Sequence, residues 1–205
     1  MSNDLTVGVI GLGSMGMGAA VSLVRAGITT LGLDLRDEAR AAFAAHGGMP
    51  APDATTLGRL SDVVLVYVVN AAQARDALFG EGGVVAEARK GTVFVICVTM
   101  QPGDAVDICD RLAKAGMLAI DAPVSGGAVK AMEGQISMMA SGPDAAFERA
   151  APALEAISAT GFRLGEAPGA GARMKVINQM LAGVHIAAMA EAMVMAASQD
   201  MDLAE

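Results

Sequence analysis

The stretch Val7-Gly8-Val9-Ile10-Gly11-Leu12-Gly13-Ser14-Met15-Gly16 decides the fold. Apolar β-branched residues precede the glycines and helix formers follow them, which predicts a buried strand, a tight turn and a helix over about residues 14–26. Gly11, Gly13 and Gly16 have the G-x-G-x-x-G spacing. In this pattern the first glycine permits the turn, the second lets a pyrophosphate approach the backbone, and the third lets the helix pack closely against the strand.

A dinucleotide at this turn predicts cofactor contacts from every residue of the turn, namely Gly11, Leu12, Gly13, Ser14, Met15 and Gly16. The next strand, residues 29–34, ends at Asp34, 18 residues past Gly16, where an acid binds the hydroxyls of the adenosine ribose. Arg36 is interpreted as a surface residue, and Asp34 would repel a 2′-phosphate, so NAD is predicted rather than NADP. The alternative is a strand, turn and helix that bind no ligand.

The composition excludes several classes of function. The chain has 205 residues, 54% of them hydrophobic, and a net charge of -8, which argues against a nucleic-acid or anionic membrane surface. Two cysteines outside any C-x-x-C motif favour a reduced, cytoplasmic protein, and two distant histidines predict no metal site. Residues 5–24 carry no charge, but the glycine turn divides them, so no targeting or membrane-spanning segment is predicted.

Strands and helices alternate from residue 6 to residue 121. Apolar runs at 62–69, 92–98 and 117–121 have the pattern of strands buried on both faces. Helices are predicted over 37–45, with Asp37 as its cap, 71–78 and 104–114. The fold class is therefore α/β, a Rossmann-type, doubly wound, mostly parallel sheet.

Ligands of such folds bind at the carboxyl ends of the strands. Val68, Val69 and Thr99 lie at such ends and are candidates for cofactor contact, with ordinary strand-end packing as the alternative. After the last of these strands, Ser125, Gly126 and Gly127 form a loop whose N–H groups and hydroxyl suit a substrate carboxylate. A strand over 136–140, a helix over 144–156 and a short strand over 161–164 follow.

The clearest boundary is the Pro- and Gly-containing stretch at 166–171, which divides the chain into residues 1–167, the dinucleotide-binding domain, and 168–205. Beyond it a long helix of about residues 172–198 has an apolar face that needs a partner. Lys175 shares a face of this helix with Gln179, and Asn178 lies beside them. Lys175 is the candidate acid–base, with a solvated helix lysine as the alternative.

Three motifs in one order resemble the β-hydroxyacid dehydrogenases. They are Gly11-x-Gly13-x-x-Gly16, Asp121-Ala-Pro-Val-Ser-Gly-Gly127 and Gly169-x-Gly171-x-x-x-Lys175-x-x-Asn178-Gln179. The resemblance covers essentially the whole chain, and it is greatest for the branch that oxidises L-threonate. It implies NAD-linked oxidation of a small β-hydroxy acid, with 3-hydroxyisobutyrate and tartronate-semialdehyde or glycerate as alternative substrates. A non-catalytic dinucleotide-binding module and an NADP-linked enzyme of the 6-phosphogluconate type are the rival interpretations.

The resemblance also implies roles for individual residues. Lys175 matches the catalytic lysine, Ser125 to Gly127 match the substrate loop, Val68 and Val69 the cofactor loop, and Thr99 a contact near the nicotinamide. Many relatives have asparagine four residues after the lysine, where this chain has Gln179, so either Asn178 or Gln179 orients the substrate. The family continues into an all-helical domain that supplies much of the subunit contact. We therefore expect that the long helix begins such a domain, incomplete here, and that the protein is a homodimer or homotetramer through this region.

Overall fold

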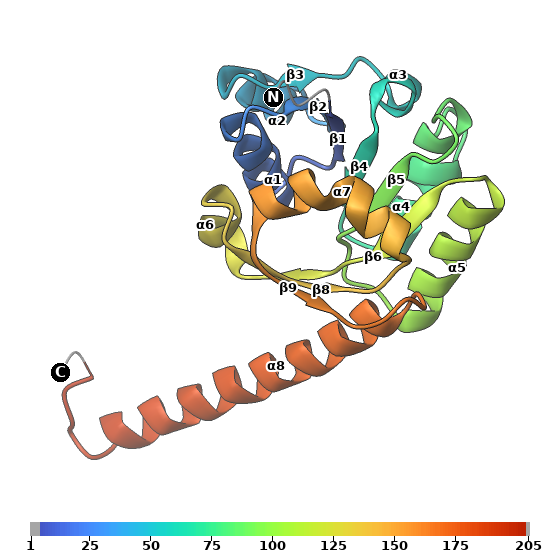
Figure 1. Ribbon diagram of the computed structural model, residues 1–205. Coiled ribbons are helices and arrows are strands. Elements are labelled where there is room, and N and C mark those ends of the chain that lie inside the picture. The colour runs from blue at the N-terminus through green and yellow to red at the C-terminus, as the bar shows by residue number, and fades with distance from the viewer. Residues whose placement is uncertain (1–4, 204–205) are drawn as a thin grey trace.

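The computed structural model describes residues 5–203 and contains two sheets and eight α-helices in that range (Figure 1). The strands are β1 (Thr6–Ile10), β2 (Thr29–Leu33), β3 (Met49–Pro50), β4 (Val63–Val66), β5 (Val93–Ile96), β6 (Leu118–Asp121), β7 (Val124–Ser125), β8 (Ile136–Ala140) and β9 (Ser158–Arg163). The helices are α1 (Ser14–Arg25), α2 (Asp37–Ala45), α3 (Ala54–Leu60), α4 (Ala71–Phe79), α5 (Pro102–Lys114), α6 (Gly127–Met132), α7 (Asp144–Ile157) and α8 (Ala170–Ala197), with a short 3-10 helix, η1, at Val84–Ala86.

The larger sheet has six strands in the order β3-β2-β1-β4-β5-β6, and every pair in it is parallel. Strand order reverses between β1 and β4, and in such sheets ligands bind in the crevice at that reversal. The predicted fold class, a Rossmann-type doubly wound sheet followed by a long helix, is confirmed.

Helices cover both faces of this sheet and bury its strands. Along β4, Val63 and Leu65 belong to the core that includes residues of α1, α2 and α7, whereas Val64 and Val66 belong to the core that includes residues of α3, α4 and α5. Successive side chains of a strand point to opposite faces, so a run of four apolar residues fills both cores. All four residues are fully buried, which is why the sequence shows a continuous apolar run rather than alternation.

A second sheet, which the sequence did not separate from the first, has the order β7-β8-β9. Strand β7 pairs antiparallel with β8, and β9 pairs parallel with β8. The backbones of Asp121 and Ser141 exchange two hydrogen bonds, each of 2.9 Å, and join the small sheet to the end of β6. Pairing across more than ten residues of intervening chain fixes this sheet, and local periodicity contains no signal for it.

Three local predictions were wrong. Asp37 does not cap its helix: it is the first residue of α2, the cap position belongs to Arg36, and Asp37 forms an ion pair with Arg40. Of the three residues predicted as a loop, Ser125 is the last residue of β7 and Gly127 is the first residue of helix α6. The last strand of the domain starts at Ser158 rather than 161, because α7 runs directly into β9 without a turn.

Helix α8 extends away from the rest of the molecule (Figure 1). Of its 28 residues only Gly171, Ala172 and Lys175 are buried, so it contacts the body through its first turns. Within residues 5–203 it is the one helix long and apolar enough to cross a membrane by length and composition alone. The uncharged N-terminal segment noted in the sequence is instead β1 and the buried helix α1.

Candidate active site

The glycine turn between β1 and α1 has the geometry that its spacing predicts. Gly11 has φ +88°, and a Cβ there would lie 2.6 Å from the carbonyl oxygen of Tyr67. A Cβ on Gly16 would overlap the carbonyl oxygen of Gly11. At Gly13, by contrast, a Cβ would meet no described atom within 4 Å. The first and third glycines are therefore required by packing, while the second opens onto free space.

That free space lies in front of the N-terminus of α1. The cap residue of this helix is Gly13, which has no side chain to accept a hydrogen bond from the first turn. The first N–H groups of a helix have no intrahelical acceptor, and they carry the positive end of the helix dipole. An anionic pyrophosphate fits this cradle, because a Cβ on Gly13 would fill the space that the phosphate needs.

A cavity of about 470 Å³ extends from this cradle and brings together residues of both predicted subsites. It is lined by Gly13, Ser14, Met15, Gly16, Tyr67, Val68, Val69, Cys97, Thr99, Val124, Ser125, Gly126, Gly127, Lys175 and Gln179. The glycine turn, the ends of β4 and β5, the 125–127 loop and the long helix thus meet at one cavity, although they are far apart in sequence.

Lys175 reaches this cavity from the second turn of α8. The residue is only 5% exposed, so the interpretation as a solvated helix lysine does not describe its position. Burial lowers the pKa of its amine below the ordinary lysine value, because the charged form loses hydration. A lysine with a lowered pKa has a larger neutral fraction near physiological pH and is better able to accept a proton.

Gln179, one helical turn beyond Lys175, lines the cavity with it, whereas Asn178 is half-buried and is not among the lining residues. The spacing of four residues places Lys175 and Gln179 on the same face of α8, while three residues rotate Asn178 to its side. Of the two amides, Gln179 is therefore the one that lines the cavity beside the lysine.

The 125–127 loop also lines the cavity. Ser125 ends β7, and Gly126 and Gly127 both have positive φ, +138° and +79°. Positive φ at two successive residues is readily adopted only by glycine, and it turns the backbone N–H groups of the loop away from a regular strand. Such turned N–H groups suit a carboxylate.

Asp34 lines neither cavity and is held by the protein itself. Its Oδ2 accepts a hydrogen bond of 2.7 Å from the N–H of Leu12, and its Oδ1 pairs with Arg36 at 3.0 Å. Although partial burial opposes ionisation, these contacts together keep the pKa of Asp34 below the usual aspartate value. The acid thus fastens the glycine turn to the end of β2.

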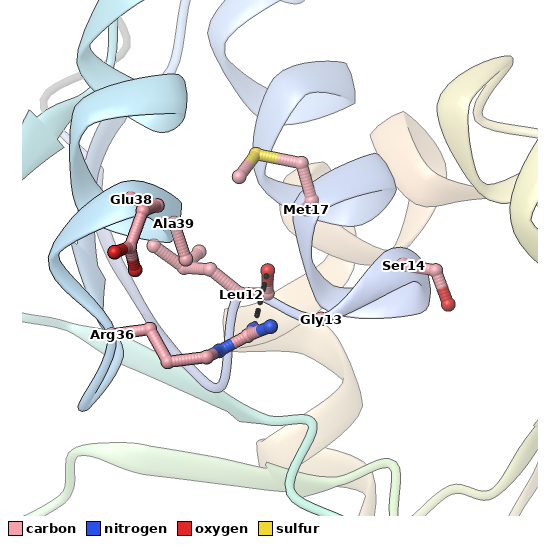
Figure 2. Close-up of a pocket in the computed structure, with 7 residues that line it drawn as sticks. All are labelled: Leu12, Gly13, Ser14, Met17, Arg36, Glu38 and Ala39. Atoms are coloured by element: carbon pink, nitrogen blue, oxygen red, sulfur yellow. Dashed lines mark hydrogen bonds between the residues drawn. The ribbon is translucent and has the colours of Figure 1, made fainter.

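A second cavity of about 350 Å³ lies between the starts of α1 and α2 (Figure 2). Arg36, which the sequence assigned to the surface, lies on its wall and donates from Nη2 to the carbonyl oxygen of Leu12 at 3.4 Å. Glu38 lies on the same wall. Leu12, Gly13, Ser14, Met17 and Ala39 complete the lining.

The sequence missed three residues of the larger cavity: Tyr67, Cys97 and Val124. Tyr67 and Cys97 each follow directly after a buried strand, so strand-end position was the available signal. The Tyr67 hydroxyl is buried, and it has no hydrogen-bond partner among residues 5–203. Burial raises the pKa of the Cys97 thiol to about 12, which keeps the sulfur protonated and unreactive. No group of three or more potential metal ligands occurs in the described part of the chain.

The chain matches two family models. Residues 6–165 match the NAD binding domain of 6-phosphogluconate dehydrogenase, and residues 169–205 match the NAD-binding region of NADP-dependent 3-hydroxyisobutyrate dehydrogenase.

Among curated proteins, L-threonate dehydrogenase of Escherichia coli K12 is 50% identical over 196 residues, which are 95% of this chain and 65% of the relative. The corresponding enzyme of Haemophilus influenzae is 45% identical over 203 residues, 98% of this chain and 67% of the relative. The chain therefore spans about two thirds of the length of these relatives.

Among solved structures, 3-hydroxyisobutyrate dehydrogenase from Salmonella typhimurium superposes with a TM-score of 0.90 at 45% identity. The match covers 96% of this chain and 69% of that one. The fold, the glycine cradle and the sequence similarity all point to the same family. The chain belongs to the β-hydroxyacid dehydrogenase family, whose 3-hydroxyisobutyrate dehydrogenase-like members share its NAD-binding domain.

Proposed function

We propose that this protein catalyses the NAD-dependent oxidation of a small β-hydroxy acid, and that the substrate is L-threonate. The observation that carries the proposal is the single cavity in which a buried lysine faces a dinucleotide cradle and a glycine loop. The likeness to L-threonate dehydrogenases, at 45–50% identity over nearly the whole chain, supports the choice of substrate.

The cofactor is held by the residues of the glycine turn, Gly11 to Gly16, together with Val68, Val69 and Thr99. When bound, NAD supplies the acceptor for the hydride. Asp34 contacts the ribose. NAD is preferred over NADP because the Arg36 guanidinium already pairs with Asp34, and because Glu38 adds a negative charge to the smaller cavity, between the starts of α1 and α2. A 2′-phosphate in the smaller cavity would meet the Glu38 carboxylate.

The substrate carboxylate binds to Ser125, Gly126 and Gly127, and the amide of Gln179 orients the substrate beside Lys175. During oxidation the substrate hydroxyl transfers its proton to the neutral Nζ of Lys175 as the C–O single bond becomes a double bond and the carbon loses hydride with its electron pair. In the reverse direction the ammonium returns that proton to the oxygen. Asn178 has a supporting role beside Gln179.

The reaction is tested by following NADH absorbance with purified protein and a substrate panel of L-threonate, 3-hydroxyisobutyrate, glycerate and 3-hydroxypropionate. We expect L-threonate to give the highest kcat/KM. Lys175→Ala should lower kcat at least a hundredfold, which is the usual contribution of a general base. Lys114→Ala, which removes a lysine from the end of α5 that does not line the cavity, is the matched control and should leave kcat unchanged.

Two outcomes would contradict the proposal. Turnover that survives in Lys175→Ala would remove the lysine from the chemistry. Binding of NAD without turnover of any acid in the panel would favour the rival interpretation, a non-catalytic dinucleotide-binding module. Preference for 3-hydroxyisobutyrate or glycerate would retain the chemistry but change the substrate.

We further propose that residues 1–167 form the cofactor domain, that residues from 168 onward start a helical domain, and that a second copy of the chain covers α8 in a cytoplasmic homodimer or homotetramer. Exposed apolar side chains occur along this helix, among them Met180, Val184 and Met189. Met180→Glu with Val184→Glu should lower the mass measured by sedimentation. The control is Leu60→Glu on α3, and an unchanged mass in the double variant would contradict this assembly.

A further inference from the structure

Helix α8 begins without a cap of its own. Its cap residue is Gly169, which has φ +90° and no side chain to bond the first turn. The first N–H groups of any helix need acceptors, and a helix end that is buried without them is strongly destabilised. The start of α8 is buried, so its N–H groups must be satisfied from elsewhere in the chain.

Asp121, at the end of β6, supplies the acceptor. Its Oδ2 accepts hydrogen bonds from the N–H of Gly169 at 3.0 Å and from the N–H of Ala172 at 2.9 Å. Ser141, whose backbone pairs with that of Asp121, accepts from the N–H of Gly171 through its hydroxyl at 3.3 Å. Two strand ends, one from each sheet, therefore accept three hydrogen bonds from the start of the helix, donated by the N–H groups of Gly169, Gly171 and Ala172.

The fit between the helix and the strand ends leaves no spare room. A Cβ on Gly171 would lie 2.6 Å from the carbonyl oxygen of Asp121 and would overlap that of Met139. The carboxylate itself is buried, with the residue only 1% exposed, and its Oδ1 has no hydrogen-bond partner among residues 5–203. Burying a carboxylate with one unpaired oxygen costs desolvation free energy, and the two hydrogen bonds to Oδ2 offset part of that cost.

We propose that Asp121 is a positioning residue that acts through the first turn of α8 to hold Lys175 in the cavity. Lys175 lies three residues beyond Ala172, less than one helical turn from the bonded N–H. It is also the last buried residue of the helix, and everything after it is exposed or half-buried. Because no fully buried residue follows Lys175 in the helix, the depth of the lysine depends on the first turn, which Asp121 holds. The inference rests on the role proposed for Lys175.

The test compares Asp121→Ala and Asp121→Asn with Asp53→Ala. The Asp53 carboxylate caps α3 by accepting from the N–H of Thr56, so its loss removes a helix cap far from the cavity and serves as the matched control. Three quantities are measured: amide hydrogen exchange of residues 169–175, the pKa of Lys175 by NMR of 13C-dimethylated protein, and kcat and KM. Lys175→Arg assigns the lysine signal.

In Asp121→Ala we expect exchange at Gly169 and Ala172 to accelerate at least tenfold. The pKa of Lys175 should rise toward the ordinary value of about 10.5, because the freed turn lets the amine reach water. We expect kcat to fall at least tenfold while the KM for NAD stays unchanged, since the glycine turn is untouched. Asp121→Asn retains an acceptor oxygen and should restore most of the slow exchange and the lowered pKa. Asp53→Ala should change none of these quantities.

Unchanged exchange and an unchanged Lys175 pKa in Asp121→Ala would overturn the proposal. If Asp121→Ala does not fold, Ser141→Ala provides the same test, because it removes the acceptor of the Gly171 N–H. We then expect smaller increases in amide exchange and in the Lys175 pKa, and the absence of any increase would overturn the proposal. The exchange and pKa measurements do not depend on turnover. If Lys175→Ala remains active while Asp121→Ala shifts the Lys175 pKa, the proposed function is refuted but the positioning role of Asp121 is supported.

Discussion

Gly13 and Gly16 differ in what a single methyl group would meet, and this difference predicts opposite phenotypes for the same substitution. In Gly13→Ala the new Cβ enters open space, and the backbone at φ -68°, ψ -175° is accessible to alanine. In Gly16→Ala the Cβ overlaps the carbonyl oxygen of Gly11 and lies 2.9 Å from the Cβ of Tyr67. The first variant should lose the ligand, and the second should lose stability.

The magnitudes follow from these contacts. Gly16→Ala forces backbone against backbone, and overpacking of this kind costs about 2 kcal/mol, or roughly 4–8 °C in Tm for a chain of this size. In Gly13→Ala the loss of a weak helix cap lowers the free energy of unfolding, and the reduced flexibility of the unfolded chain raises it. The two effects nearly cancel, so the free energy of unfolding should change by no more than about 0.5 kcal/mol. Its methyl group instead occupies the phosphate position. Losing two charge-assisted hydrogen bonds at about 1.5 kcal/mol each weakens NADH binding roughly a hundredfold.

The assay is a pair of titrations on each variant: NADH binding followed by nicotinamide fluorescence, and unfolding in urea followed by circular dichroism. Gly103→Ala is the control, because a Cβ there also meets no described atom within 4 Å and the position lies outside both cavities. Wild-type affinity for NADH in Gly13→Ala would refute the assignment of the cradle. Wild-type stability in Gly16→Ala would refute the packing argument.

Two further predictions concern charge. The pKa of Lys175 is lowered on folding, so between that pKa and 10.5 the unfolded chain binds more protons, and the free energy of unfolding should rise with pH in this window. The oxidation rate should rise with pH through the lowered pKa itself and then level off, because it depends on the neutral amine of the folded enzyme. A pH–rate profile without a rising limb below pH 10.5 would contradict the acid–base role. Asp34→Ser frees Arg36 and removes a repulsive carboxylate, which should shift the ratio of kcat/KM for NADP over NAD upward at least tenfold; an unchanged ratio would show that Asp34 does not select the cofactor.

The sequence by itself determined the class of the larger sheet, the glycine turn and the alternation of strands and helices up to residue 121, because each depends on local periodicity and on glycine spacing. Gly16 is required by a contact with Gly11 inside one β-α unit, so its role could be predicted from a dozen residues. The positive φ of Gly11 follows from the same turn, but the contact that a Cβ there would make, with Tyr67 after β4, has no local signal in the sequence. The boundaries of the buried strands were predicted less closely, since apolar runs continue past the last paired residue, as at Val68.

Tertiary structure alone decided which distant groups meet. The anchor of α8 joins Asp121 to residues 48 and 51 positions later, and no local pattern specifies such a pair. Likewise the rotation of α8 against the sheet placed Gln179 rather than Asn178 on the cavity wall. The turn between β2 and α2 brought Arg36 to Asp34. Periodicity fixes which face of an element is apolar, but the position of that element along and around its axis is set only when its buried donors find acceptors on another part of the chain.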